Sequence, residues 1–304
     1  MQYRRPKRNV SGVLLLDKPL GFSSNQALQK VKWIFQAAKA GHTGTLDPLA
    51  TGLLPLCFGE ATKFAHYLTD ADKTYIATIK LGVTTNTGDA EGQVLSTHIV
   101  NVSPAEFANA CEQFIGKISQ IPPMYSALKH EGKALYEYAR AGVEIQRASR
   151  IITIHSIKVN TFAHDVANVS VSCSKGTYVR TLAEDIGAVL GCGAHLSGLR
   201  RIQTANYSIE QAVTLEQFEA MNLEQRQTAL MPMDSAVLHL PAILIDADST
   251  HYLRQGQAVW QSGVNVKGLL RLYNENHEFL GLGEQDDDGK IAPKRLIINN
   301  DNVG

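Results

Sequence analysis

The residue types best suited to catalysis lie in one short segment, residues 41–55, with the sequence GHTGTLDPLATGLLP. It holds an imidazole (His42), a carboxylate (Asp47), three glycines and two prolines. Glycine is an unfavourable choice for a simple connector, because it loses more conformational freedom on folding than any other residue. A loop of this composition is therefore a candidate for a chemical role. The alternative is a glycine-rich turn that begins at Asp47-Pro48 and has no chemical role.

Spacing argues against several other kinds of site. A Walker A phosphate loop is excluded, because no G-x-x-x-x-G-K-[ST] sequence occurs. His42 has no second histidine or acid at ligand spacing, which favours a hydrogen-bonded histidine over a metal ligand. The four cysteines lack C-x-x-C spacing, which argues against zinc or a disulfide framework and favours a reducing cytoplasm. The acidic run at residues 286–289 lacks the later ligands of an EF-hand and predicts a solvated hairpin turn.

The elements that must position this segment follow from periodicity and capping signals. Residues 10–16 are mostly apolar, as in a buried strand, and a DKPLG turn follows them. Ser23 and Gln26 have the spacing of a capping box, which predicts the start of an amphipathic helix. Residues 75–81 alternate in the manner of a half-buried strand.

Later signals extend an α+β pattern. Ser103 and Glu106 form a second capping box, with proline at the first helical position, and Gly116 is expected to end that helix. Strands are expected at residues 150–159 and 166–173, and helices at residues 177–189 and 214–220. After residue 238 the chain changes to short β-like runs, which predict a small β-rich module: 242–245, 269–273, 279–283 and 295–298.

Composition and charge describe a globular protein that could bind nucleic acid. Of 304 residues, 44% are hydrophobic and 19% charged, and the length suits one large and one small domain. No apolar run approaches the ~20 residues that span a bilayer, and no signal peptide is evident, so we expect no membrane partner. The formal net charge is +0, but Lys and Arg predominate in residues 1–80 and 117–180, and Asp and Glu in 81–116 and 209–304. Such segregation can produce the basic face that contacts phosphates.

A series of motifs in residues 10–205 resembles the TruB-type pseudouridine synthases. Residues 41–52 match the family signature G-H-x-G-x-L-D-P-x-A-x-G. The other matching motifs are, in order, Gly12-Val13 with Lys18-Pro19-x-Gly21, Gly59-Glu60-Ala61-Thr62-Lys63, Lys73-Thr74-Tyr75, Pro122-Pro123-x-Tyr125-Ser126-Ala127, Gly176-Thr177-Tyr178-x-Arg180 with Asp185, and Leu199-Arg200-Arg201. Beyond residue 238 the likeness is weaker: Leu253-Arg254-x-Gly256 and Pro293-x-Arg295 resemble parts of a PUA RNA-binding module.

This resemblance implies an isomerase that converts uridine 55 in the T loop of tRNA to pseudouridine. The reaction breaks the N1–C1′ bond, turns the uracil and rejoins it through C5, so it needs neither a cofactor nor a metal. The resemblance assigns the nucleophile to Asp47, the cation that keeps it ionised to Arg180, and the ring that packs on the flipped-out uracil to Tyr75. The sequence leaves open whether Asp47 attacks C6 or C1′, or acts as a base at C2′.

Supporting roles are implied as well. Tyr178 and Leu199 would line the same pocket, and His42 would fill the space that the base leaves in the RNA stack. Lys18 and Pro19 would support the active-site loop, with Lys18 near phosphate. The candidates for contacts with the RNA backbone are Lys63, Lys129, Lys133, Arg140 and Arg147. Without the resemblance, Arg180 would be interpreted as an exposed helix charge, and Tyr75, Tyr178 and Leu199 as core residues.

The expected fold is α+β, with a mixed, mostly antiparallel sheet and flanking helices followed by a β-rich, PUA-like module. The expected domains are a catalytic domain at residues 1–237, with an RNA-binding insertion at about 120–150, and a module at residues 238–304. The expected partner is the T arm of tRNA, bound by a cytoplasmic monomer without a guide RNA. Two alternatives are a non-catalytic tRNA-binding or folding factor, and a glycosidase in which Asp185 or Glu60 supplies the second carboxylate.

Overall fold

The largest unit of the fold is a mixed sheet. The computed structural model describes residues 7–264 and 266–298, and within them eleven strands share one sheet. Its order is β14 (Val213–Thr214), β1 (Gly12–Lys18), β3 (Ala50–Phe58), β12 (Ala194–Thr204), β4 (Lys73–Leu81), β11 (Val166–Cys173), β10 (Arg150–Ala163) and β7 (Gly116–Gln120). Attached at its sides are β2 (Ala40–His42), β13 (Tyr207–Ser208) and β15 (Leu230–Met231). The pairs β1–β14 and β3–β12 are parallel and the others antiparallel, which confirms the predicted sheet.

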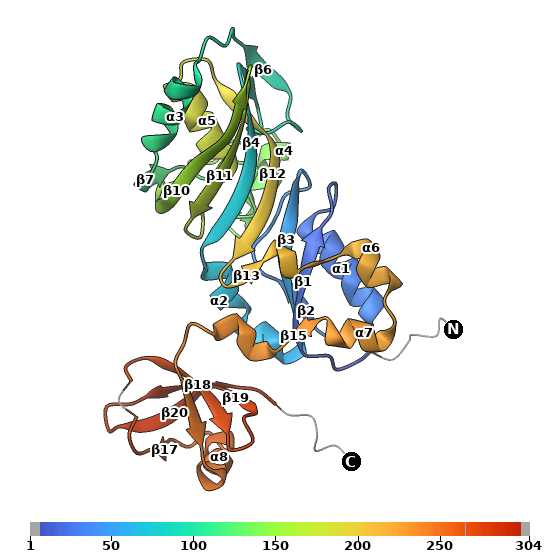
Figure 1. Ribbon diagram of the computed structural model, residues 1–304, viewed down its shortest axis with the longest axis vertical. Helices are drawn as coiled ribbons and strands as arrows, with labels where there is room; N and C mark the ends of the chain where they lie inside the picture. Colours follow the sequence, from blue (N-terminus) through green and yellow to red (C-terminus); the bar gives the residue numbers. More distant parts are fainter. Residues whose placement is uncertain (1–6, 265, 299–304) are drawn as a thin grey trace.

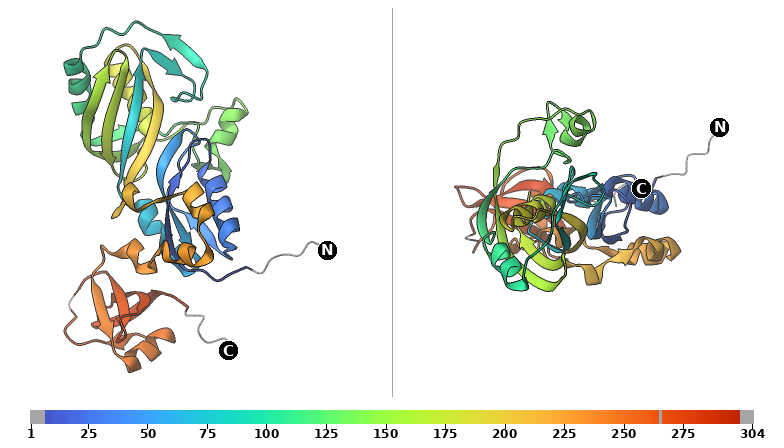
Figure 2. Two further views of the ribbon diagram at one scale, coloured as in Figure 1. Left: turned by 45° about the vertical axis from the view of Figure 1, so that its right-hand side comes forward. Right: turned by 90° about the horizontal axis from the view of Figure 1, so that it is seen from above.

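Strand β12 joins the two halves of this sheet. Its residues 199–201 pair with the start of β3, while most of its length pairs with β4 on the other side. Figures 1 and 2 show β1 and β3 on one side of β12, and β4, β11 and β10 on the other. The loop between β2 and β3, which holds residues 43–49, therefore lies where the two halves meet.

The burial of the central strands explains their sequences. In β4 the buried residues alternate with half-buried ones, which confirms the predicted period of two. Its buried side chains are Lys73, Tyr75, Ala77, Ile79 and Leu81. Strand β3 is buried along almost its whole length, as expected for a strand with neighbours on both edges and covered faces.

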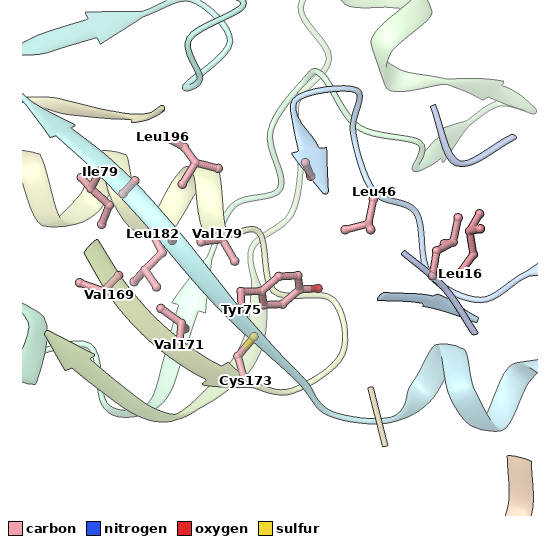
Figure 3. Packing of buried hydrophobic residues seen from close by; sticks show 14 of the residues in the cluster. Leu16, Leu46, Tyr75, Ile79, Val169, Val171, Cys173, Val179, Leu182 and Leu196 are labelled. Carbon is pink, nitrogen blue, oxygen red and sulfur yellow. The ribbon is translucent and has the colours of Figure 1, made fainter. Parts of the chain in front are cut away.

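Two helices cover the half of the sheet that contains β4. These are α3 (Pro104–Glu112) and α5 (Val179–Val189), and their apolar residues Phe107 and Leu182 belong to the same buried cluster as Ile79 and Val169. Figure 3 shows Leu182 and Val179 close to β4, with Val179 near the Tyr75 ring. Helix α5 begins at Val179, two residues later than predicted.

The other half carries α1 (Ser24–Phe35), α6 (Leu215–Ala220) and α7 (Leu223–Thr228). The rings of Phe35 and Phe218 meet edge to face, with centroids 5.7 Å apart. Capping boxes form at the starts of α1 and α3, as their spacing predicted, and another forms at the start of α6. The shorter elements are η1 (Gly59–Phe64), α2 (Ala65–Asp70), β5 (Val83–Thr85), β6 (Val94–Thr97), β8 (Lys129–His130), β9 (Lys133–Ala134), α4 (Leu135–Arg140), η2 (Ile209–Gln211) and η3 (Met233–Val237).

The C-terminal part is a separate five-stranded sheet with one helix. Its order is β16 (Ala242–Ile245), β18 (Leu269–Asn274), β19 (Phe279–Gln285), β20 (Lys290–Leu296) and β17 (Val259–Trp260), with α8 (Ala247–Arg254) beside it. We call these elements the C-terminal module, and Figure 1 shows them at one end of the molecule. Residues 286–289 connect β19 to β20 in the predicted hairpin turn.

Several predicted boundaries besides the start of α5 are wrong, among them the end of the strand expected at residues 150–159, which continues to Ala163. The first strand spans Gly12–Lys18 rather than 10–16, because its pairing with β3 continues to Lys18. The helix that begins after Ser103 ends at Glu112, and Gly116 instead starts β7 because it pairs with β10. The last strand ends at Leu296 instead of spanning residues 295–298.

Two further expectations concern membranes and cysteines. Within the described residues, no helix combines the length and the apolar character that crossing a bilayer requires. All four cysteines fall in the described part of the chain, where they are buried and form no disulfide.

Candidate active site

Asp47 lies on the β2–β3 loop, and both of its neighbours are held by residues at or just before the start of α1. The Ser24 hydroxyl accepts a hydrogen bond from the Leu46 amide at 2.7 Å and donates to the Leu46 carbonyl at 3.0 Å. The Gly21 amide donates to the Pro48 carbonyl at 2.9 Å. Because the backbone is fixed on each side of it, Asp47 has a defined position at the junction of the two half-sheets.

Arg180 pairs with Asp47, as the sequence resemblance implied. The Asp47 Oδ2 and Arg180 Nη2 atoms are 3.0 Å apart, and the two side chains are 44% and 8% exposed, respectively. Arg180 Nη2 also donates to the Tyr125 carbonyl at 2.6 Å. The interpretation of Arg180 as an exposed helix charge is therefore wrong. The pair consists of a buried cation and a carboxylate that stays open to solvent.

A second carboxylate, Asp89, holds the other side of the same guanidinium. Its Oδ2 atom lies 3.2 Å from Arg180 Nη1, which also donates to the Thr87 carbonyl at 3.1 Å. Asp89 is itself fixed, because its Oδ1 atom accepts from the Thr87 hydroxyl at 2.6 Å and from the Glu91 amide at 3.1 Å. Sequence reasoning missed Asp89. The available signal was a threonine two residues before an acid in a glycine-containing turn, which many surface turns share.

The charges around Asp47 act on its pKa in opposite directions. Burial raises the pKa of Asp47 above its ordinary value, and the neighbouring Asp89 raises it further. Arg180 and Lys18 lower the pKa of the Asp47 carboxyl, but they do not cancel the effect of burial. Arg180 therefore favours the ionised form of a group that would otherwise bind a proton more readily.

Tyr75 and Leu199 extend the site across two neighbouring strands. Leu199 pairs with Ala77, and Arg201 pairs with Tyr75, between β12 and β4. Directly paired residues in a sheet project to the same face, so Tyr75, Leu199 and Arg201 lie on one side. The Tyr75 side chain is 9% exposed, and Figure 3 shows its ring beside Val179 and Cys173 with the hydroxyl at its outer end.

Tyr178 is held at the start of α5 by a side chain from β7. The Gln120 amide group accepts from the Tyr178 backbone N–H at 2.8 Å and donates to the Tyr178 carbonyl at 3.1 Å. Gln120 is 2% exposed, and sequence reasoning missed it. Since Arg180 follows two residues later, Gln120 also helps to fix the origin of the Arg180 side chain.

Lys18 and Pro19 lie beneath the loop. Lys18 is fully buried, and its ammonium donates to the carbonyls of Pro19 and Phe22. Burial lowers the pKa of Lys18 to about 8, with Asp47 acting in the opposite direction. These contacts stabilise the turn whose Gly21 amide binds Pro48. The expected proximity of Lys18 to phosphate stays a prediction.

His42 ends β2, four residues before Leu46 and five before Asp47. Its Nδ1 atom is buried and has no hydrogen-bond partner within the described residues. Burial and the nearby Arg201 lower the pKa of His42, which favours a neutral imidazole. In the described part of the chain, no three His, Cys, Asp or Glu side chains are grouped to hold a metal ion.

The candidates for RNA-backbone contacts fall into two groups. Lys129, Lys133 and Arg140 are exposed in the insertion formed by β8, β9 and α4, and Arg147, which is partly buried, follows them. Lys63 lies elsewhere, and its ammonium binds Glu60 at 2.6 Å and the Leu296 carbonyl at 2.8 Å. The contacts of Lys63 therefore favour a structural role at the C-terminal module.

Comparisons with known proteins show the family to which the chain belongs. Residues 32–179 match the TruB family pseudouridylate synthase N-terminal domain, 180–238 the tRNA pseudouridylate synthase B C-terminal domain, and 241–297 the C-terminal domain of pseudouridine synthase II TruB. A protein from Methylobacillus flagellatus named tRNA pseudouridine synthase B is 59% identical over 297 residues, or 98% of each chain. The protein of that name from Pseudomonas aeruginosa is 51% identical over 300 residues, 97% of this chain and 99% of the relative.

The chain belongs to the TruB family of pseudouridylate synthases. Its fold is also shared with the crystal structure of a Cbf5-Nop10-Gar1 complex, with a TM-score of 0.74 and 26% identity over 95% of this chain and 86% of the other. The TruB family matches include the C-terminal module as well as the large sheet. The α+β fold inferred from the sequence is thus the pseudouridine synthase fold.

Proposed function

We propose that this enzyme isomerises uridine 55 in the T loop of tRNA to pseudouridine, with Asp47 as the nucleophile. The observation that carries the proposal is the ion pair of a solvent-open Asp47 with a buried Arg180 at 3.0 Å. Membership of a pseudouridine synthase family and full-length relatives named tRNA pseudouridine synthase B support the coarser statement, an isomerase that acts on tRNA uridine.

In the proposed reaction, the target uridine leaves its base stack and enters the pocket. Extrusion costs a few kcal/mol, which stacking and hydrogen bonding in the pocket offset. Tyr75 packs on the uracil, and Tyr178 and Leu199 supply the walls. The N1–C1′ bond breaks and a C5–C1′ bond forms, so the C5 hydrogen leaves as a proton and N1 gains one. No net oxidation or group transfer takes place.

Arg180 has two tasks in this proposal. It favours the ionised form of Asp47, whose pKa is raised by burial, and it fixes one carboxylate oxygen, so that the other points to the substrate. Arginine suits both tasks, because it stays protonated and holds several acceptors in a planar fork.

The remaining assignments concern RNA binding. A neutral His42 presents a flat face that can fill the gap left by the extruded base. Lys129, Lys133, Arg140 and Arg147 would contact the RNA backbone from the insertion at about 120–150, and the module at 238–304 would act as a PUA-like RNA-binding domain. We propose a cytoplasmic monomer that binds the T arm and needs no guide RNA.

The geometry disfavours a glycosidase. Such an enzyme generally needs a second carboxylate, about 5–10 Å away, that reaches the substrate. Asp89 shares Arg180 with Asp47, but its side chain is only 4% exposed and its oxygens are engaged. Glu60 is occupied by Lys63 and by the Ile298 amide. Asp89 thus serves to hold a cation.

The test uses a tRNA transcript labelled with tritium at C5 of uridine, because pseudouridine formation releases that hydrogen to water. The wild type is expected to release one equivalent from position 55, and none from a transcript with cytidine at that position. Asp47→Asn should abolish release while largely sparing tRNA binding. Asp165→Asn, which removes a carboxylate paired with Lys80 away from the site, serves as control.

Each rival predicts a different result. A glycosidase would release free uracil, and a folding factor would bind tRNA without tritium release. Turnover by Asp47→Asn at the wild-type rate would show that Asp47 is not the nucleophile.

A further inference from the structure

Arg201 is a buried cation that lacks an acidic partner. It lies on β12 and is 1% exposed. Its Nε atom donates to the Leu53 carbonyl at 2.7 Å, and its Nη2 atom donates to the Gly44 carbonyl at 3.2 Å. None of the ion pairs formed by residues 7–264 and 266–298 includes Arg201. Its hydrogen bonds to these two carbonyls leave its charge without a nearby negative group.

This arrangement is unfavourable for stability alone. Removing a charge from water costs several kcal/mol, and an apolar residue of similar size is often the more stable choice. The neighbourhood of Arg201 is also cationic, because its charge contributes to the lowered pKa of both Lys18 and Lys73. A guanidinium at this place therefore points to a role other than core packing.

The two carbonyls that Arg201 binds lie on either side of the nucleophile. Gly44 precedes Asp47 on the loop, and Leu53 follows it in β3. A guanidinium presents its donors in one rigid plane, so it can hold both carbonyls at a fixed separation. No apolar residue offers such donors, and lysine offers a single ammonium on a flexible stem.

Two glycines let the loop close around Arg201. Gly44 has φ +78°, and a Cβ there would lie 3.2 Å from Arg201 Nη1. Gly52 has φ +100°, and a Cβ there would lie 2.2 Å from the Arg201 carbonyl oxygen, where no side chain fits. The loop that carries Asp47 is thus shaped to the side chain and backbone of Arg201.

We infer that Arg201 is a positioning residue, which sets the geometry of Asp47 by clamping the Gly44 and Leu53 carbonyls. The inference rests on the proposed function of Asp47. Arg201 acts through the loop backbone and makes no contact with Asp47 itself. Its pairing with Tyr75 between β12 and β4 ties the same clamp to the strand that presents the aromatic ring. Arg201 thereby fixes the position of Asp47 relative to Tyr75, on whose ring the uracil is proposed to pack.

The adjacent Arg200 provides a matched control. It lies on the other face of β12, is 40% exposed, and pairs with Asp17 at 2.6 Å. Arg200→Met therefore removes a guanidinium at the neighbouring position without touching the clamp. Arg201→Met removes the clamp, and Arg201→Lys keeps the charge but cannot hold both carbonyls in one plane.

The experiment measures tritium release in a single turnover with excess enzyme, together with tRNA affinity. For Arg201→Met we expect a rate constant about 100-fold lower at full amplitude, because a displacement of about 1 Å can have this effect. The Kd for tRNA should change less than about 3-fold. Arg201→Lys should fall between Arg201→Met and the wild type, and Arg200→Met should stay near the wild-type rate.

The outcomes separate positioning from folding. A purely structural role would lower the folded fraction, measured by circular dichroism of the free enzyme, and leave the rate constant at saturating folded enzyme unchanged; this result would overturn the inference. If Arg201→Met does not fold, Arg201→Lys serves as the test in its place. A wild-type rate constant for Arg201→Lys would then also overturn the inference. A wild type without activity on the uridine-55 transcript would defeat the proposed function instead.

Discussion

At the scale of single residues, the site is organised by one guanidinium that two carboxylates share. Arg180 binds the solvent-open Asp47 through Nη2 and the buried Asp89 through Nη1. Asp89 has two opposite effects on the ionisation of Asp47. It orients Arg180, which favours the ionised nucleophile, and its own negative charge raises the pKa of Asp47. Removing the charge of Asp89 should separate these effects.

We expect Asp89→Asn to lower the plateau rate and to move the acid limb of the pH profile. The reaction needs ionised Asp47, so the rate falls as the pH drops through the pKa of this group, which lies above its ordinary value. Without the charge of Asp89 the pKa of Asp47 falls, and the acid limb moves to lower pH. The plateau should drop about 10- to 100-fold, because Arg180 loses an anchor.

Single-turnover tritium release between pH 4.5 and 8 at saturating enzyme measures both quantities. Asp165→Asn, which alters a partly exposed ion pair elsewhere, should retain the wild-type profile. A limb that moves to higher pH in Asp89→Asn would contradict the assignment of repulsion between the two carboxylates.

The sequence predicted some of these residues and missed others for identifiable reasons. Asp47 and Arg180 stand in specific motifs, so a resemblance was enough to pair them across the chain. Asp89 acts through the side chain of the distant Arg180, and Gln120 acts through hydrogen bonds to the distant Tyr178 backbone. The local sequences of both residues resemble ordinary turns and strand ends. The contacts of Arg201 were equally invisible, since they depend on where β12 crosses β3.

At the scale of elements, signals that depend on neighbours in sequence were reliable. The capping box of Ser23 and Gln26 formed, and so did the alternating strand β4. Strand ends were less predictable, because they depend on a partner. Strand β1 extends to Lys18 since it pairs with Gly52 of β3. The same glycine lies opposite Arg201, where β3 and β12 come together.

Gly52→Ala should be strongly destabilising. A Cβ there would overlap the backbone of Arg201, and its φ of +100° is unfavourable for any side chain. The strain of such a conformation alone costs about 1–3 kcal/mol, and separation of the strands adds to it. We expect a loss of more than about 2 kcal/mol in the free energy of unfolding, measured by urea denaturation.

Gly41→Ala is the matched control for this substitution. Gly41 lies in the same β2–β3 hairpin, but a Cβ there would meet nothing within 4 Å, and its φ is not positive. The free energy of unfolding of the Gly41→Ala variant should differ from that of the wild type by less than about 0.5 kcal/mol, as is usual for substitutions that cause neither a clash nor backbone strain. If both substitutions changed the free energy of unfolding equally, the close approach of β3 to β12 would not be what requires glycine at position 52.

At the scale of the whole molecule, the C-terminal module is attached to the large sheet by a shared core. Leu282 of β19 is 1% exposed and belongs to a buried cluster with Phe64 and Leu53. The rings of Phe64 and Phe279 lie 5.4 Å apart. Beside this cluster, Lys63 and Glu60 bind the Leu296 carbonyl and the Ile298 amide. Both parts of the chain thus meet at η1, which directly follows the strand β3.

This shared core predicts that the two parts unfold together and that Leu282→Ala separates them. Truncating a buried leucine costs about 2–5 kcal/mol, and here much of that loss falls on the contact between the parts. Pulsed hydrogen exchange across a urea series, with peptides from β4 and β18, reports the unfolded fraction of each part. In the wild type the two midpoints should coincide, whereas in Leu282→Ala that of β18 should fall below that of β4.

Leu196→Ala, in the core of the large sheet, should instead lower the midpoint of β4 at least as much as that of β18. If β4 and β18 already have separate midpoints in the wild type, the attachment is too weak to couple the two parts, and the module is an independent domain.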